Sequence, residues 1–218
     1  MKIARYGPAA LMVIAPLSLA LGGVLFPYPT IRGHDPQGYL ALAWFSQIWL
    51  LTLAPAVIGV GVVAMRGAPL LGALGLVLTV PGTLNADGNP YDLVYAGVRE
   101  GVPVATLERM MERVYELPAY SPAGVWLYGV AFGAGALLLG VALLVGRSAP
   151  WWAGFALVAS AVVAMLGAWV ELPDVARPIG WTLATAAFAG CAVSLVRHHP
   201  TSAARRSSPP TVEEPSGA

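Results

Sequence analysis

The stretch AGVWLYGVAFGAGALLLGVALLV, residues 123–145, contains no charged side chain and no proline. A helix of roughly 20 apolar residues is long enough to cross the ~30 Å hydrocarbon core of a membrane. In that core each backbone N–H and C=O group must find its partner within the protein, so a helix is the expected conformation. The run does not alternate apolar and polar residues as a barrel strand of ~10 residues would. We therefore expect residues 123–145 to form a transmembrane helix.

Five more runs have the same character, and the six together span residues 9–26, 39–65, 68–84, 123–145, 151–170 and 179–196. The chain has 218 residues, of which 57% are hydrophobic and 11% are charged. Soluble domains are about 45–50% apolar and about 25% charged. We expect an all-α fold, a polytopic membrane helix bundle with six transmembrane helices within residues 1–197. The Pro-, Ser- and Ala-rich segment 198–218 is expected to be a disordered tail.

The first run also invites comparison with a signal peptide, because Lys2 and Arg5 precede it. The run is longer than the ~7–15 apolar residues of a signal peptide, and no small-x-small cleavage site follows it. We expect it to remain as the first helix.

The orientation follows from the positions of lysine and arginine, which favour the cytoplasmic side of a membrane. With six crossings and a cytoplasmic N-terminus, seven of the twelve basic residues lie inside: Lys2, Arg5, Arg66, Arg147, Arg197, Arg205 and Arg206. Nine of the eleven acidic residues lie outside. We predict that both termini are cytoplasmic and that the chain is located in the cell (inner) membrane.

The long outer loop holds the stretch ATLERMMERVYEL, residues 105–117. On a helical projection its charged residues occupy one arc and its apolar residues the other, which is the pattern of an amphipathic helix. Pro103 suits the first turn and Pro118 ends it, so we predict an outer helix over 103–117. Its face of Leu107, Met111 and Val114 either rests on the lipid interface or closes over the bundle as a lid, and we favour the lid.

Three helices carry internal prolines, and proline removes a backbone donor and kinks a helix. Pro16 and Pro55, together with the polar side chain of Gln47, are our candidates for the lining of a cavity. Small residues such as Gly129 and Gly133 let helices approach closely, either within the chain or between two copies. A homo-oligomer, or an unidentified membrane partner, therefore stays open.

Several kinds of chemistry lack the residues they need. Haem ligation requires axial ligands such as histidine inside the bundle, and the histidines lie at 34, 198 and 199. The chain has one cysteine and a net charge of +1, so we expect no cofactor, no thiolate metal site and no nucleic-acid partner. The motifs of zinc proteases, serine hydrolases and P-loop proteins are absent from the sequence.

A scatter of polar residues at the outer ends of the helices could converge on a catalytic or metal site, although we expect no bound metal. The candidates are His34, Asp35, Asp87, Asp92 and Glu171. An acid–base pair or a hard-cation site needs such groups within a few ångströms of one another. The alternative is that they are ordinary turn and cap residues in water.

Two stretches carry a resemblance to a known class of protein: LALGGVLFPYP at 19–29, leading to a short HDP loop, and RSAPWWAGFALVASAVVAMLGAW at 147–169. With a long outer loop after the third apolar run, this plan resembles uncharacterised small bacterial six-helix integral membrane proteins. The resemblance implies a fold class and a location, and no activity.

We therefore expect a membrane protein whose partner is the lipid bilayer and whose role is structural or an interaction with other components. One alternative is a subunit of a small-molecule or lipid transporter with a cavity at Pro16, Gln47 and Pro55. A second alternative is an outer-face membrane enzyme built on the polar residues above.

Overall fold

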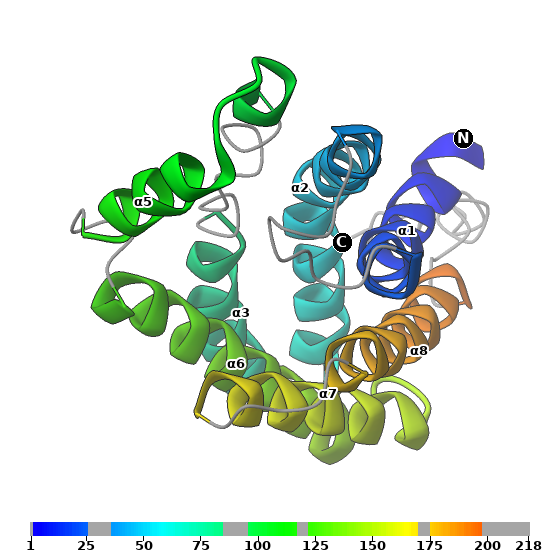
Figure 1. The fold of residues 1–218 in the computed structure, drawn as a ribbon. Coiled ribbons are helices and arrows are strands. Elements are labelled where there is room, and N and C mark those ends of the chain that lie inside the picture. Colours follow the sequence, from blue (N-terminus) through cyan, green and yellow to red (C-terminus); the bar gives the residue numbers. More distant parts are fainter. Residues whose placement is uncertain (1, 26–35, 85–95, 117–121, 170–174, 198–218) are drawn as a thin grey trace, which may run out of the picture.

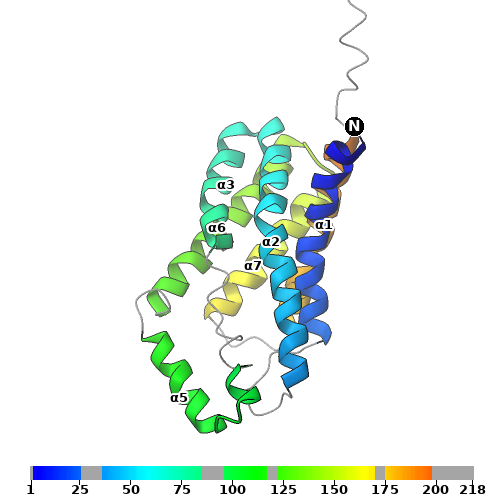
Figure 2. The ribbon, with the colours of Figure 1, turned by 90° about the horizontal axis from the view of Figure 1, so that it is seen from above.

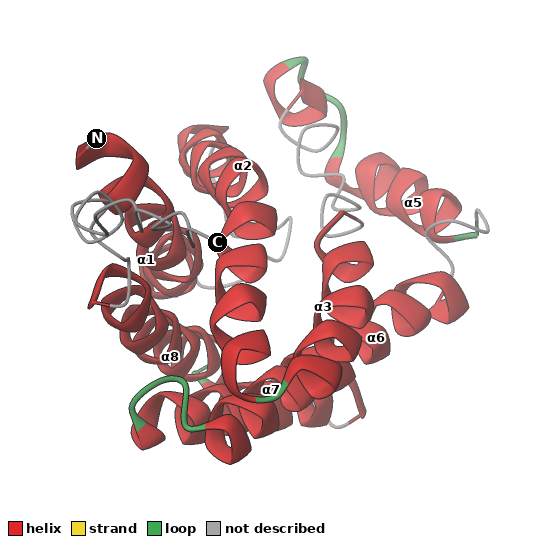
Figure 3. Ribbon diagram, turned by 180° about the vertical axis from the view of Figure 1, so that it is seen from behind, coloured by secondary structure: helices red, strands yellow, loops and turns green. Residues whose placement is uncertain are grey.

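A computed structural model describes residues 2–25, 36–84, 96–116, 122–169 and 175–197, and these residues are 92% helical and contain no strand. Seven helices follow one another: α1 (Lys2–Leu25), α2 (Pro36–Gly67), α3 (Pro69–Leu84), α5 (Val104–Tyr115), α6 (Pro122–Gly146), α7 (Trp151–Trp169) and α8 (Ala176–Arg197). The predicted all-α class is confirmed (Figures 1 and 3). Six of these helices lie on the six apolar runs, and α5 lies on the amphipathic stretch.

Prolines mark where most of these helices begin. They occupy the first position of α2, α3 and α6, the position before α5 and α7, and the first turn of α8: Pro36, Pro69, Pro122, Pro103, Pro150 and Pro178. At the first turn of a helix the missing N–H of proline costs nothing, because that group has no partner within the helix anyway. The exception is α1, which starts at Lys2 instead of at residue 9; Lys2, Ala4 and Arg5 favour a helix, although Gly7 and Pro8 follow them.

The six long helices run up and down. Gly72 of α3 packs against Met65 of α2, and Gly61 farther back along α2 packs against Leu76 farther along α3. Later residues of α3 therefore contact earlier residues of α2, which is the geometry of an antiparallel pair. The same ordering relates α7 to α8, where Gly190 meets Ala153 and Gly180 meets Val163.

The bundle closes into a ring. Helix α1 packs on α2, α2 on α3, α6 on α7 and α7 on α8, and the contacts of α1 with α8 and of α3 with α6 close the ring. Helix α2 also contacts α6 and α8, so it occupies the middle of the arrangement. Figure 2 shows the bundle from the side, with the start of α1, the α2–α3 turn and the α6–α7 turn at one end and α5 at the other.

Glycines allow two of these helix pairs to touch backbone to backbone. A methyl group built on Gly135 of α6 would lie 2.6 Å from the backbone nitrogen of Thr79 and 2.7 Å from the carbonyl oxygen of Gly75. Gly140 of α6 and Gly154 of α7 face each other in the same way, each 3.1 Å from the other's carbonyl oxygen by that measure. Such close crossings replace the hydrophobic driving force that helices lack in lipid.

The hydroxyl groups inside the bundle bond to their own helices. Thr79 donates to the carbonyl of Gly75 at 2.6 Å, Ser18 to that of Ala15 at 2.7 Å, and Ser194 to that of Gly190 at 3.1 Å. A buried hydroxyl without a partner would be costly in an apolar interior. These side chains are therefore satisfied without forming a polar path between helices.

Three segments are long and apolar enough to cross a membrane: Gln47–Gly67, Gly129–Gly146 and Ala176–Arg197. Shorter apolar segments lie in α1, α3 and α7. Many large apolar side chains on the outside of the bundle are exposed, among them Leu51, Leu70, Val77 and Val145. Their exposure suits a lipid environment, and the chain has the character of a membrane protein.

Candidate functional site

Helix α5 is built by its sequence as an isolated amphipathic helix. Pro103 precedes it with φ −56° and ψ 135°, an extended conformation that leads into a helix, and Glu116 ends it with its N–H directed to the carbonyls of Arg113 and Val114. Its apolar and charged side chains segregate far more strongly than those of the other described helices. Figures 1 and 2 place α5 beyond the ends of α3 and α6, at the edge of the bundle and away from its middle.

The apolar face of α5 is only partly covered. Leu107 is 1% exposed, and it packs so closely on Gly97 that a Cβ atom at Gly97 would clash with it. Val114 is half-buried, while Met110 is 41% exposed. The side chain of Met111 lies outside the description. Within the described chain α5 packs mainly on the turn that precedes it, because it has no extensive contact with any of the long helices.

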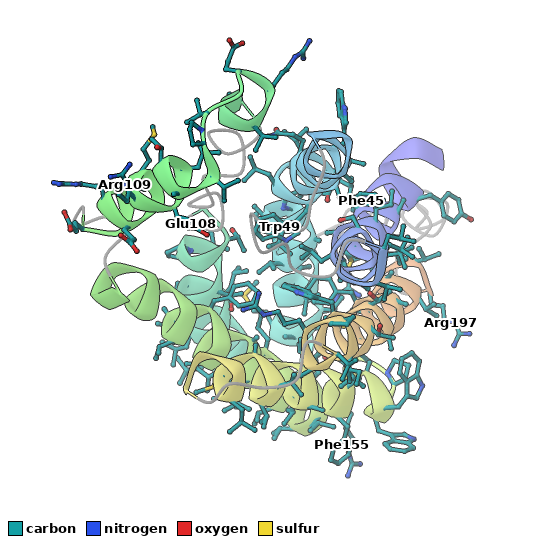
Figure 4. All side chains as sticks on the ribbon, in the orientation of Figure 1. Phe45, Trp49, Glu108, Arg109, Phe155 and Arg197 are labelled. Carbon is teal, nitrogen blue, oxygen red and sulfur yellow. The ribbon has the colours of Figure 1, made fainter. Side chains whose placement is uncertain are left out.

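The charged arc of α5 divides into two edges. Glu108, Glu112 and Glu116 follow one another at intervals of four residues and form an acidic edge. Arg109 and Arg113 have the same spacing and form a basic edge, since residues four apart lie above one another on a helix. Figure 4 shows Glu108 on the flank of α5 nearer α3 and Arg109 on the outer flank. The two signs therefore face different surroundings.

A shallow open cavity of about 430 Å³ follows the basic edge. The lining residues are Thr106, Arg109, Met110, Arg113 and Val114. Arg109 is held back along the helix, with Nε donating to the carbonyl of Ala105 at 3.3 Å and Nη2 to Oγ1 of Thr106 at 3.3 Å. The cavity therefore joins two guanidinium groups to an apolar strip, and none of the described acidic side chains lines it. Such a surface suits an anionic group that carries an apolar part.

The other end of the bundle carries only basic charge among the described residues. Arg66, Arg147 and Arg197 are exposed there, while the described acidic residues all lie between 100 and 116. Gly67 and Gly146 touch through their backbones, so the α2–α3 and α6–α7 turns that bear Arg66 and Arg147 are neighbours. Next to them Trp151 and Phe155 stack edge to face at 5.8 Å on the exposed surface of α7.

The sequence-derived site residues are placed as follows. His34, Asp35, Asp87, Asp92 and Glu171 lie outside the described residues, so their convergence stays a prediction. Of the proposed cavity lining, Pro16 is buried inside the bundle, whereas Gln47 and Pro55 are exposed. None of these three lines the cavity on α5. Within the part of the chain that the structure describes, no three His, Cys, Asp or Glu side chains are grouped as metal ligands would be.

Sequence reasoning missed the basic edge of α5, although its signal was present. The helical projection separated charged from apolar residues and treated the charges as one class. The i, i+4 spacing of Arg109 and Arg113 beside Glu108, Glu112 and Glu116 already divides that class by sign.

No protein-family model, curated protein or solved structure matches the chain. The function must therefore be argued from the geometry alone.

Proposed function

We propose that the chain is a six-crossing protein of the bacterial cell membrane that serves as a structural or interaction component. In this role the six long helices form a packed scaffold. The surfaces that contact other molecules lie at the two ends of this scaffold. The bilayer is its immediate partner. Small-molecule transport and outer-face catalysis are the competing roles.

The six crossings are supported by how the helices are joined. Each helix that contains a long apolar segment packs antiparallel to a helix whose apolar segment is shorter. Examples are α2 with α3 and α6 with α7. The shortest, α3, has 16 residues, which at 1.5 Å per residue gives about 24 Å. Because α3 packs lengthwise on α2 and α6, a membrane that encloses those two helices encloses α3 as well.

The proposed orientation, with both termini in the cytoplasm, rests on charge. The end of the bundle with the two short turns carries Arg66, Arg147 and Arg197 without an acidic residue among those described. Short loops with an excess of lysine and arginine favour the cytoplasmic side. The exposed Trp151 and Trp152 at the same end suit the polar boundary of the bilayer, where indole rings gather.

The continuous apolar core formed by the described residues is the observation that carries the proposed role. Met12, Leu53, Val60 and Leu143 come from three different helices and are all fully buried in one continuous core. The hydroxyls among the helices are bonded to their own backbones. A transporter needs an aqueous or polar path between its helices. The apolar packing therefore favours the role of a structural or interaction component.

The single cysteine tests this role directly. Cys191 of α8 is 0% exposed and lies in the same core. We expect small water-soluble thiol reagents to leave Cys191 unmodified in the folded protein and to modify it fully after denaturation in SDS. A Val60→Cys variant provides a second reporter in α2 with the same expected behaviour.

Modification of both thiols in folded protein would show a water-accessible path and would favour the transporter role. An exposed control is Glu112→Cys, which should react at once in either state. Mass spectrometry of the intact chain gives the extent of each reaction.

A further inference from the structure

We propose that the basic edge of α5 binds the phosphate group of an anionic phospholipid, with the acyl region of that lipid along Met110 and Val114. The inference rests on the proposed membrane location and deepens it, because it assigns a ligand class to one surface of the protein. It does not depend on which side of the membrane α5 occupies.

The cavity has the chemistry of a lipid headgroup site. Arg109 and Arg113 stand one helical turn apart along its length, and Thr106 adds a hydroxyl beside Arg109. Guanidinium groups bind phosphate through paired charge-assisted hydrogen bonds, which a single ammonium group does not reproduce. Met110 and Val114 line the same cavity, so an apolar chain and an anionic group would be accommodated side by side.

The acidic residues of α5 do not line this cavity. Glu108, Glu112 and Glu116 form the acidic edge of the charged arc, and none of them is among the lining residues. Glu108 is half-buried on the flank nearer α3, whereas Arg109 is exposed on the outer flank (Figure 4). A phosphate in the cavity would therefore contact the two guanidinium groups, while Glu112 and Glu116 lie about one turn along the helix from Arg109 and Arg113.

The position of α5 favours a lipid as the source of the phosphate. The helix lies at the edge of the bundle end, past α3 and α6 (Figure 1), and Arg109 points outward from the bundle (Figure 4). The exposed apolar surface of α3, with Leu70, Leu74 and Val77, marks the side of the bundle that lipid tails would cover. A lipid standing beside α3 and α6 would bring its headgroup to the level of α5.

The lipid preference of purified protein tests this proposal. The protein is incorporated into nanodiscs that contain phosphatidylcholine and phosphatidylglycerol in equal amounts, and the retained lipids are counted by native mass spectrometry. We expect the wild type to retain phosphatidylglycerol preferentially. In an Arg109→Gln/Arg113→Gln variant this preference should fall by roughly 30-fold at most, since each arginine near an anionic surface contributes about 1 kcal/mol.

Three variants serve as controls. Arg109→Lys/Arg113→Lys keeps both charges but loses the paired guanidinium hydrogen bonds, so its preference should fall between that of the wild type and that of the double glutamine variant. Glu112→Gln/Glu116→Gln alters the opposite edge, and Arg99→Gln removes an exposed arginine that does not line the cavity, so both should retain the wild-type preference. Unchanged reactivity of Cys191 establishes that the bundle of long helices is intact in every variant, and unchanged amide hydrogen exchange in residues 104–115 establishes that α5 is intact.

The proposal is wrong if the double glutamine variant keeps the wild-type preference, or if the wild type has none. It is also wrong if Arg99→Gln causes an equal loss, because the effect would then be one of general charge. These outcomes are separate from those of the thiol experiment. If the core thiols are protected but the protein shows no lipid preference, only this inference is overturned. If the protein prefers the anionic lipid but the core thiols react, only the proposed structural role is overturned.

Discussion

Gly135 and Gly129 lie in the same helix and have opposite surroundings. A methyl group on Gly135 would meet the backbone of α3 at Thr79 and Gly75, whereas nothing lies within 4 Å of the same position on Gly129. We predict that Gly135→Ala destabilises the bundle by about 1–3 kcal/mol, the usual cost of forcing an extra methyl group into a packed interior. Gly129→Ala is the matched control and should be neutral or stabilising, because alanine favours a helix by up to about 1 kcal/mol over glycine.

The measurement is the SDS fraction at which half of the protein unfolds, with modification of Cys191 as the reporter. Equal stability of the two variants would contradict the close α3–α6 crossing.

The contrast between these glycines also shows how far residue-level prediction reaches. The sequence pairs Gly129 with Gly133 in a GxxxG pattern, yet only Gly133 is packed, against Met165 of α7. Two close crossings use Gly75 with Gly135 and Gly140 with Gly154, which join helices distant or adjacent in the chain without any shared motif. The role of a glycine depends on the helix that packs against it, and that helix cannot be predicted from the neighbouring residues in the sequence.

At the scale of elements, one of the described side chains of α5 is buried. Leu107 supplies the contact with Gly97, while Met110, on the same helix, is largely exposed. We predict that Leu107→Ala loosens α5 and raises its rate of amide hydrogen exchange, because a buried leucine contributes about 2–5 kcal/mol. Met110→Ala should change the exchange rate little.

The long helices should be unaffected in both variants, since α5 has no extensive contact with them. Exchange in α2 and α6 that rises along with α5 would show that α5 supports the bundle after all.

Sequence alone located the helices well because two independent signals coincide. Apolar runs give the position of each long helix, and prolines such as Pro69 and Pro122 give the start. Neighbour relations could not be predicted in the same way. In a soluble helix the polar face identifies the side away from the core, but here core and lipid are both apolar. Helices α6 and α8 accordingly show almost no apolar periodicity, so the sequence does not indicate which face of each helix packs against its neighbours.

The candidate polar site could be predicted even less completely. His34, Asp87 and Glu171 are candidates because the predicted crossing pattern puts them on one side of the membrane, and that pattern does not fix the distances between them. The basic edge of α5, by contrast, follows from residue spacing within a single helix. It can be predicted from the sequence once the positive and negative residues of that helix are considered separately.

At the scale of the whole molecule, the distribution of arginine predicts the orientation. We predict that Arg147→Cys, in a Cys191→Ala background, is labelled by a membrane-impermeant maleimide only after the cell membrane is permeabilised. Glu112→Cys in the same background should be labelled in intact spheroplasts, because α5 lies at the opposite end of the bundle (Figure 2). Labelling of both positions without permeabilisation would rule out the proposed crossing pattern.

The contact between α1 and α8 has a consequence for biosynthesis. Of the described long helices, α1 leaves the ribosome before the others and α8 after them, and the two are neighbours in the finished ring. Until α8 is made, the face of α1 that it will cover stays open, so this part of the bundle closes only after all six described long helices have been synthesised.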